Sequence, residues 1–311
     1  FLAQEYREHP NIIFHLVDIR DEENLTHKMN DVDVVIHTAA YKHVLFCEAS
    51  PDEAIKTNII GLQNVIASAA AKGVRWLAFT STDKAVNPTS VMGTSKLMGE
   101  RIVTAANRDH ENNNTKMFSV RFGNILGSRG SVMPIFYEQI RKGREITLTD
   151  RGMTRFVMTI EQSARLILNS VPIAKGGEVI VTKMPVIRIS DLAEVMIEAL
   201  GNQFGHKPED IPIKLIGMQP GEKIYEELMS DQEVARSLNV KDYLIIPPNY
   251  RQSTKNIYDV VLEAPIDKPY NSANSIALTR SQLHQFLLQE ELLSYRQSNQ
   301  YYPNERFYYV T

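Results

Sequence analysis

The sequence contains a single cysteine, Cys47, among its 311 residues. One thiol excludes an internal disulfide and any metal site built from several cysteines, and it fits a reducing compartment. The longest apolar stretch, 59–74, is interrupted by Gln, Asn, Ser and Lys, which excludes a membrane span there. The net charge of -3 and the pI of about 6.3 give no broad basic surface, so neither nucleic acid nor an anionic membrane is an expected partner. These absences predict a globular protein of the cytoplasm.

What the sequence does contain is an alternation of apolar runs and helical segments. We expect strands over 12–19, 32–40, 75–82 and 116–125, and helices over Asp21–Met29, 49–73, Ser95–Ala106, Val132–Lys142 and Thr279–Leu293. Strands separated by helices of this length are typical of βαβ units with right-handed crossovers. We therefore predict an α/β fold with a Rossmann-like doubly wound parallel sheet, followed by a smaller C-terminal α/β region.

A dinucleotide-binding sheet carries a Gly-rich turn, G-x-G-x-x-G, after its first strand. The 311 residues contain no such turn. Counting back from the run 12–19, the first βα unit and the second strand are missing. We therefore expect a few tens of residues before Phe1, since a βαβ unit takes about 30 or more. Those residues would carry the phosphate-binding turn, and whether membrane helices also precede Phe1 stays open.

The end of the expected strand 75–82 and the helix after it resemble a known catalytic arrangement. In the short-chain dehydrogenase/reductase superfamily, a Tyr-x-x-x-Lys pair follows a strand that ends in Ser or Thr. Here the strand ends FTST (79–82), and Met92-Gly-Thr-Ser-Lys96 takes the corresponding place. A thioether is at best a weak hydrogen-bond acceptor, so Met92 cannot take a hydroxyl proton. The substitution argues against an ordinary dehydrogenase that depends on the phenol.

Segments along nearly the whole chain resemble one branch of that superfamily, the UDP-N-acetylglucosamine 4,6-dehydratases of capsule, O-antigen and flagellin-glycan pathways. They are HTAAYKHV (37–44), KTNIIGLQNV (56–65), STDKAVNP (81–88), RFGNILGSRGSVMPIF (121–136), ITLTDRGMTRFVM (146–158), PGEKIYEEL (220–228) and YNSANSIALTRSQLHQFLL (270–288). The resemblance implies an NAD(P)-binding core over 1–126, to which about 157–182 returns. It also implies a substrate-binding region over 127–156 and 183–311, ending in a C-terminal arm.

The resemblance implies roles for Asp83 and Lys84 in a dehydration. Such an enzyme oxidises C4 of the sugar, removes the C5 proton, expels the C6 hydroxyl and reduces C6. By resemblance Asp83 is the acid to the leaving hydroxyl and Lys84 is the base at C5. Burial and a cationic nicotinamide would lower the pKa of the lysine, and burial would raise that of the aspartate. The alternative is a surface turn in which both side chains are merely solvated.

The other site residues are also implied by the resemblance. The catalytic set is Thr82, Asp83, Lys84, Met92 and Lys96. The cofactor, NADP or NAD, would contact Asp18, Ile19, Ala39, Ala40, Tyr41, Asn58, Thr80, Lys96 and Phe122. The UDP-sugar would contact Lys42, Asn124, Ser131, Val132, Thr149, Arg155 and Glu222. We expect no metal site, because His37 and His43 have no partner at metal-ligand spacing.

Three functions remain open from the sequence. The first is a 4,6-dehydratase, with inversion at C5 as in the short family members with similar tails. The second is a retaining dehydratase or a UDP-sugar 4-epimerase on the same scaffold, although an epimerase would normally keep the tyrosine. The third is a non-catalytic NAD(P)-binding regulatory protein, which the missing Gly-rich turn would favour. The aromatic C-terminal tail predicts a homo-oligomer.

Overall fold

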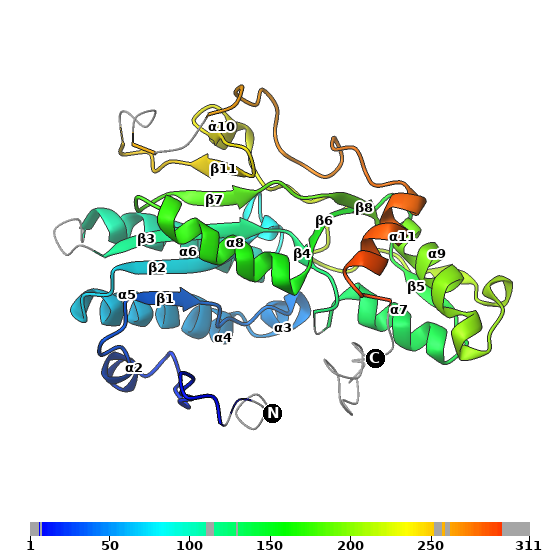
Figure 1. Cartoon of the computed structure of the whole chain (residues 1–311), viewed down its shortest axis with the longest axis horizontal. Coiled ribbons are helices and arrows are strands. Elements are labelled where there is room, and N and C mark those ends of the chain that lie inside the picture. Colours follow the sequence, from blue (N-terminus) through cyan, green and yellow to red (C-terminus); the bar gives the residue numbers. More distant parts are fainter. Residues whose placement is uncertain are drawn as a thin grey trace.

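The computed structural model describes residues 6, 8–109, 115–128, 130–251, 257–258 and 262–293. Figure 1 shows two α/β regions side by side. The larger one contains the strands β1, β2, β3 and β7, and the smaller one contains β5, α7, α9 and α11. The chain passes between the two regions more than once, because β6 and β8 lie at their junction and β7 returns to the larger sheet.

The larger region is built on a six-stranded sheet in the order β1-β2-β3-β7-β11-β10. Its strands are β1 (Val34–His37), β2 (Trp76–Thr82), β3 (Lys116–Phe122), β7 (Val179–Thr182), β11 (Tyr243–Ile246) and β10 (Leu238–Asn239). The first four strands are parallel, β11 is antiparallel to β7, and β10 is antiparallel to β11. This sheet confirms the predicted α/β class with a mainly parallel sheet.

Helices cover both faces of the sheet. They are α5 (Gly61–Ala71) and α6 (Val91–Asp109) on one face and α8 (Ile160–Ile173) on the other. Successive side chains of a strand point to opposite faces. Leu77 and Phe79 of β2 accordingly share an apolar cluster with residues of α5 and α6, whereas Ala78 shares one with residues of α8. The sheet is therefore doubly wound, as the alternation of strands and helices predicts.

The remaining helical elements of this region are short. They are α2 (Glu22–Lys28), α3 (Val44–Ala49), α4 (Pro51–Ala54), the π-helical segment η1 (Ile55–Ile60), the 3-10 turn η2 (Asp83–Ala85) and α10 (Asp231–Val234). The elements α4, η1 and α5 follow one another without a break, which accounts for the helix expected over 49–73. Single π-helical turns inside a helix occur often at functional sites, and η1 places Asn58 in the interior.

The smaller region has its own apolar core. Its elements are β4 (Asn124–Ile125), β5 (Ile146–Leu148), β6 (Thr154–Met158), β8 (Val186–Arg188), β9 (Ile213–Leu215), α7 (Val132–Arg141), α9 (Ile189–Leu200), α11 (Arg280–Gln289) and the 3-10 turns η4 (Asn202–Phe204) and η5 (Pro208–Asp210). Strands β4, β6 and β8 form one small sheet, and β5 pairs with β9. The helices α7, α9 and α11 bury Phe136, Leu192 and Leu283 in a common cluster.

Four secondary-structure predictions need correction. The apolar run 12–19 is not a strand, because no described strand lies beside it to pair with its backbone, and Leu16 is fully exposed. The run 32–40 forms a strand only over Val34–His37, the part that pairs with β2. The run 116–125 divides at Gly123, where an added Cβ would lie 2.6 Å from the backbone oxygen of Phe156.

The fourth correction concerns the helix expected over Ser95–Ala106, which begins four residues earlier at Val91. The hydroxyl of Ser90 accepts a hydrogen bond from the backbone N–H of Gly93 at 3.1 Å, so Ser90 caps the first turn. Met92 and Lys96 therefore lie on the same helix, one turn apart. Along the part of the chain that the structure describes, no helix is long and apolar enough to cross a membrane.

Candidate active site

The predicted site residues gather at the carboxyl ends of the parallel strands. His37, the last residue of β1, pairs with Phe79 of β2, and Thr82, the last residue of β2, pairs with Phe122, the last of β3. Residues that follow these strands therefore share one edge of the sheet. In open α/β sheets this edge is where ligands bind.

Asp83 and Lys84 form the turn η2 directly after β2. The hydroxyl of Thr82 accepts a hydrogen bond from the backbone N–H of Lys84 at 3.4 Å and donates one to Asp83 Oδ1 at 2.9 Å. The first turn of α6 packs on this turn at Gly93, where an added Cβ would lie 2.3 Å from the backbone oxygen of Lys84. Only glycine permits so close an approach, and it fixes the turn against the helix that carries Met92 and Lys96.

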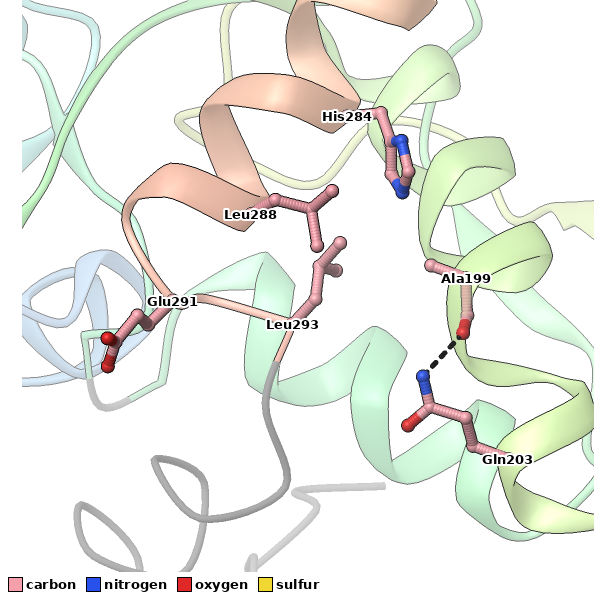
Figure 2. A pocket seen from close by; sticks show the side chains of 6 residues that line it. All are labelled: Ala199, Gln203, His284, Leu288, Glu291 and Leu293. Carbon is pink, nitrogen blue, oxygen red and sulfur yellow. Dashed lines mark hydrogen bonds between the residues drawn. The ribbon is translucent and has the colours of Figure 1, made fainter.

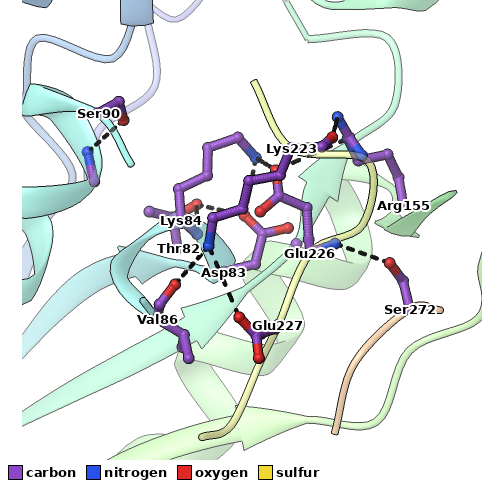
Figure 3. Close-up of polar contacts among 12 residues, drawn as sticks. Thr82, Asp83, Lys84, Val86, Ser90, Arg155, Lys223, Glu226, Glu227 and Ser272 are labelled. Atoms are coloured by element: carbon purple, nitrogen blue, oxygen red, sulfur yellow. Dashed lines mark hydrogen bonds and ion pairs between the residues drawn. The ribbon is translucent and has the colours of Figure 1, made fainter. Parts of the chain in front are cut away.

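The Lys84 ammonium lies between two carboxylates (Figure 3). Its Nζ is 2.9 Å from Asp83 Oδ1 and 3.2 Å from Glu226 Oε1. Asp83 is fully buried and Glu226 is 2% exposed, whereas the lysine side chain retains 25% exposure. The two side chains of the turn therefore do not form a solvated surface pair. A charged lysine reaches the surface of the cluster, and two buried carboxylates hold it there.

The charges around Lys84 decide its protonation state. Burial alone would lower the pKa of Lys84, but the carboxylates of Asp83 and Glu226 outweigh burial and raise it. Burial by itself therefore does not produce the expected lowering, which would also need the charge of the cationic nicotinamide. Burial raises the pKa of Glu226, and the negative charge of Asp83 adds to this against the opposing effects of Lys84 and Arg155. At rest the cluster holds an ammonium next to a carboxylate that is easily protonated.

Each of the two carboxylates has one oxygen that accepts no hydrogen bond from the described residues. Among the described residues, Asp83 Oδ2 and Glu226 Oε2 are buried and have no hydrogen-bond partner. A buried, unsatisfied acceptor costs about 1–3 kcal/mol, so a structural ion cluster would be expected to fill these positions. Two open acceptors beside a partly exposed ammonium are suited to bind a hydroxyl-rich ligand or to transfer protons.

Sequence reasoning missed Glu226. It lies in the PGEKIYEEL segment, in which the resemblance implies Glu222 as a substrate-binding residue. The available signal was the pair of adjacent acids, Glu226 and Glu227, but nothing in the sequence shows that this segment crosses the end of β2. Glu226 is held in place from its backbone, whose N–H donates to Ser272 Oγ at 2.9 Å.

Hydrogen bonds join the 220–228 segment to the loop that follows η2 (Figure 3). Lys223 Nζ donates to the backbone oxygen of Val86 at 2.8 Å. Asn87 Nδ2 donates to Glu227 Oε2 at 3.1 Å. The hydroxyl of Thr89 donates to the backbone oxygen of Gly221 at 3.3 Å. These bonds join two parts of the chain more than 130 residues apart, and they place Glu226 against Lys84.

Lys96 occupies a buried position one turn after Met92. Its Nζ donates to the backbone oxygen of Thr80 at 2.9 Å and lies 4.7 Å from the centroid of the Phe79 ring. Burial lowers the pKa of Lys96 to about 8 despite the nearby Glu100. His37 stacks on Phe79, and its burial together with the charge of Lys96 lowers its pKa to about 4. The imidazole is therefore neutral at physiological pH.

Met92 packs in a small apolar cluster with Cys47 and Ala54. Its backbone oxygen accepts a hydrogen bond from Ser95 Oγ at 2.8 Å, and Ser95 Oγ accepts one from Asn58 Nδ2 at 2.9 Å. Asn58 also makes two hydrogen bonds to the backbone of Tyr41, one through its oxygen at 2.8 Å and one through its nitrogen at 3.0 Å. Asn58 thus orders the Tyr41 loop next to the first turn of α6.

The remaining predicted cofactor residues lie near the sheet edge or in the N-terminal coil. Asp18 is exposed and forms a salt bridge with Arg20 at 2.7 Å. Ile19 packs at Gly61, where an added Cβ would lie 2.7 Å from its Cδ1. Ala39 is exposed and Ala40 half-buried after β1, whereas Phe122 is half-buried at the end of β3.

The predicted substrate residues are divided between two groups. Lys42 is exposed in the loop after β1, and Asn124, Ser131, Val132, Thr149 and Glu222 are half-buried in or near the smaller region. Asn124 Oδ1 and Ser131 Oγ have no hydrogen-bond partner among the described residues. Arg155 is buried and donates to the backbone oxygens of Thr154, Lys223 and Ile224. The structure brings its guanidinium to the 220–228 segment, 3.9 Å from Glu226.

The described residues fit one end of a nicotinamide dinucleotide. Thr80 and Lys96 form a polar, buried corner beside the neutral His37, whose Nε2 has no hydrogen-bond partner among the described residues. Such a corner suits a ribose with its neighbouring ring. The Gly-rich phosphate cradle is not part of the 311 residues. Within the described part of the chain, no three His, Cys, Asp or Glu side chains gather as they would around a metal ion.

A separate pocket of about 390 Å³ lies between α9 and α11 in the smaller region (Figure 2). It is lined by Ala199, Gln203, His284, Leu288, Glu291 and Leu293. The dashed line in Figure 2 marks the hydrogen bond from Gln203 in η4 to the backbone oxygen of Ala199 near the end of α9. None of these residues belongs to the Asp83–Lys84–Glu226 cluster, so the pocket is distinct from the candidate active site.

The chain is similar to several known proteins along most of its length. The family model described as "Polysaccharide biosynthesis protein" matches residues 2–248. An uncharacterized membrane protein of Methanocaldococcus jannaschii is 48% identical over 239 residues, 77% of this chain and 72% of that protein. A UDP-glucose 4-epimerase of Rickettsia canadensis is 37% identical over 290 residues, 91% of this chain and 83% of that protein. The capsular polysaccharide biosynthesis protein CapD of Staphylococcus aureus is 42% identical over 236 residues, 75% of this chain but 38% of CapD.

Solved structures show the same architecture. The X-ray structure of Pen from Bacillus thuringiensis is 41% identical, with a TM-score of 0.83 over 93% of this chain and 85% of that one. The dTDP-glucose 4,6-dehydratase DesIV from Streptomyces venezuelae, solved with NAD bound, has a TM-score of 0.64 at 20% identity over 71% of this chain and 72% of its own, which shows the shared fold. The chain therefore belongs to the polysaccharide biosynthesis protein family, and it is an extended short-chain dehydrogenase/reductase related to nucleotide-sugar dehydratases and epimerases.

Proposed function

We propose that the protein is a 4,6-dehydratase that converts UDP-N-acetylglucosamine to UDP-2-acetamido-2,6-dideoxy-hexos-4-ulose, with inversion at C5, in surface polysaccharide or glycan biosynthesis. The observation that carries this proposal is the buried Asp83 with its partly exposed Lys84 at the end of β2. An elimination needs an acid and a base on adjacent carbons of the sugar, and this pair supplies both. Met92 removes the phenol on which a simple dehydrogenase would depend. The name of the CapD relative supports a role in capsule-type glycans.

NADP or NAD would bind along the carboxyl ends of β1 and β2. Lys96 and Thr80 would hold the nicotinamide ribose, while Asn58 would hold the Tyr41 loop against it. When bound, the dinucleotide supplies the oxidation at C4 and the later reduction at C6. The buried Lys96, with a pKa of about 8, is largely charged at neutral pH and donates to ribose hydroxyls.

The chain's own residues would move two protons, one through Asp83 and one through Lys84. Asp83 takes the O4 proton as C4 is oxidised, using the oxygen that has no partner in the cluster. Lys84, as the neutral amine, takes the C5 proton, which the adjacent ketone has made acidic. Asp83 then gives its proton to the departing C6 hydroxyl, and water leaves. As C6 is reduced, a water molecule protonates the opposite face of C5, as inversion requires, and Lys84 gives its proton to the hydroxide that remains, so the enzyme ends each turnover as it began.

The UDP-sugar would lie between the sheet edge and the smaller region, which we assign to residues 127–156 and 183–311. Asn124, Ser131 and Val132 would contact the sugar and diphosphate, Thr149 and Glu222 the uridine, and Lys42 the sugar. Arg155 would act from its place beside Glu226. Its terminal nitrogens already donate to three backbone oxygens, so its share in diphosphate binding would be electrostatic.

A UDP-sugar 4-epimerase is the second candidate, favoured by the name of the Rickettsia canadensis relative. An epimerase oxidises and re-reduces C4 alone, so it needs a proton acceptor at O4 and no base at C5. Met92 cannot be that acceptor, and Asp83 could accept the O4 proton in either reaction. Lys84, however, would have no task in an epimerase, which favours the dehydratase.

Incubating the full-length protein with UDP-N-acetylglucosamine and NADP or NAD, and following the mixture by NMR, tests the proposal. The dehydratase predicts a 4-keto sugar nucleotide with a new C6 methyl signal, and the configuration at C5 reports inversion. A C4 epimer that keeps its C6 hydroxymethyl group would instead support the epimerase. Unchanged substrate would support a non-catalytic NAD(P)-binding protein.

A further inference from the structure

The Lys84 ammonium requires a proton acceptor before it can act as a base. Its pKa is raised, so the amine is protonated at rest, and a protonated lysine cannot accept the C5 proton. Asp83 is 2.9 Å away, but in the proposed reaction it is occupied with the O4 and O6 protons. The charged groups that face Lys84 are Asp83, Glu226 and Arg155. Of these, only Glu226 is an acceptor without another task.

The geometry of Glu226 suits that role. Its Oε1 lies 3.2 Å from Lys84 Nζ, within reach of a direct proton transfer, and its Oε2 has no hydrogen-bond partner among the described residues. The carboxyl is 2% exposed, so bulk water does not compete for the proton. The charged groups around it are Lys84, Asp83 and Arg155, and the Arg155 Nε is 3.9 Å away.

We propose that Glu226 is a positioning residue that takes the Lys84 proton before the elimination and returns it afterwards. This rests on the proposed function. One N–H bond of Lys84 breaks and one O–H bond of Glu226 forms, which converts an ammonium–carboxylate pair into an amine and a carboxylic acid. The free amine then accepts the C5 proton and releases it to the hydroxide that remains when a water molecule protonates the opposite face of C5. When the product leaves, the Glu226 proton moves back to Lys84.

The position of the 220–228 segment determines whether the proton transfer between Lys84 and Glu226 can occur. Lys223, Thr89 and Asn87 supply hydrogen bonds between this segment and the loop after η2, so Glu226 stays aligned with Lys84 only while the two are joined. Glu227 is the adjacent residue of the same segment. It bonds to Asn87 and pairs with Lys223, and it does not contact Lys84. Glu227→Gln keeps an amide oxygen that can still accept the Asn87 hydrogen bond, so it removes a charge without loosening the segment and offers a matched control for Glu226→Gln.

The test compares Glu226→Gln with Glu227→Gln in the full-length protein, measuring kcat and KM for UDP-N-acetylglucosamine as a function of pH. In Glu226→Gln, Lys84 must lose its proton to solvent, so kcat at neutral pH falls by about 100-fold and recovers about 10-fold per pH unit on alkalinisation. KM changes little, and Glu226→Asp restores part of the loss. Glu227→Gln stays within about threefold of the wild type with an unchanged profile. A uniform loss at every pH in Glu226→Gln, or an equal loss in Glu227→Gln, would overturn the role.

A second measurement needs no substrate, so it separates this inference from the proposed reaction. The rate of reductive methylation of Lys84 follows its fraction of neutral amine, with Lys84→Arg identifying the signal. Removing the charge of Glu226 lowers the pKa of Lys84, so Glu226→Gln is methylated several-fold faster at pH 8 than the wild type. Equal rates would overturn the coupling. If the rates differ and the wild type makes no 4-keto product, the proposed function fails while the coupling stands.

Discussion

Two ion clusters in this protein have the same arrangement of charges but differ in how fully their hydrogen bonds are satisfied. In each, one cation lies between two carboxylates: Lys84 between Asp83 and Glu226, and Arg121 between Glu100 and Glu233. The Arg121 cluster is saturated. Its guanidinium donates to both oxygens of each carboxylate, at 2.6–3.0 Å, and to the backbone oxygen of Leu228.

The Lys84 cluster is unsaturated and partly open. It leaves one carboxylate oxygen of Asp83 and one of Glu226 without partners among the described residues. The pKa values differ in the same sense. Despite burial, Arg121 holds the pKa of Glu233 at about 2, whereas burial raises that of Glu226. The difference indicates that the Arg121 cluster stabilises the fold and that the Lys84 cluster can exchange protons with a ligand.

Exchanging the cations tests this contrast most strongly. Lys84→Arg keeps a positive charge between Asp83 and Glu226, but a guanidinium does not give up a proton in a protein. We expect kcat of the proposed dehydration to fall by at least about 1,000-fold, because the base is lost. The melting temperature should change little. Turnover near the wild-type level would show that Lys84 is not the base.

The reverse exchange, Arg121→Lys, should affect stability instead. Lysine cannot reproduce the four contacts of the guanidinium with Glu100 and Glu233, so buried carboxylate oxygens lose their donors. Each such loss costs about 1–3 kcal/mol, and we expect the free energy of unfolding in urea to fall by about 2–3 kcal/mol. Activity per folded molecule should remain. A specific loss of kcat without loss of stability would contradict the assignment of this cluster to the fold.

The two clusters should also respond differently to acid. Glu233 has a folded pKa of about 2, below its ordinary 4.5, so it stabilises the fold above pH 4.5 and this contribution is lost as the pH falls towards 2. Glu226 has a raised folded pKa, so it opposes folding at neutral pH and ceases to do so on acidification. In Glu233→Gln the loss of stability between pH 4.5 and 2 should be smaller than in the wild type. Identical acid unfolding would contradict the lowered pKa of Glu233.

The smallest effect on the rate of dehydration is expected for a substitution of Met92. Met92→Tyr places a larger side chain against Cys47 and Ala54, and overpacking of this kind costs about 1–3 kcal/mol. Substrate binding should survive, and the rate of dehydration should not rise, because Asp83 accepts the O4 proton in the proposed mechanism. Faster turnover through a simple alcohol dehydrogenation would show that the O4 proton passes through position 92.

Much of the fold follows from the sequence because its signals are local. The apolar runs that form β2 and β3 are largely buried, and a helical segment lies between them, so their order predicts a parallel sheet. The run 12–19 has the same apolar character, but no strand among the described residues pairs with it. Pairing is a non-local property that composition does not report. The same holds for β10 and β11, which join the sheet from residues 238–246.

The site was predictable where a motif carries it and not where packing creates it. The positions of Asp83, Lys84 and Lys96 follow from the strand end and the helix after it. Glu226 approaches Lys84 from 142 positions further along the chain, through hydrogen bonds of the 220–228 segment that no local pattern indicates. Both Asp83 and Glu226 raise the pKa of Lys84, and the sequence around Lys84 does not reveal the contribution of Glu226.

The most direct test follows the C5 proton in D2O. The full-length protein is incubated with UDP-N-acetylglucosamine, and deuterium at C5 of the product is measured by NMR for the wild type, Lys84→Arg and Arg121→Lys. If the unsaturated cluster performs the elimination, the wild type and Arg121→Lys give a 4-keto-6-deoxy product with deuterium at C5, and Lys84→Arg gives neither product nor exchange. Exchange at C5 by Lys84→Arg at the wild-type rate would contradict the account.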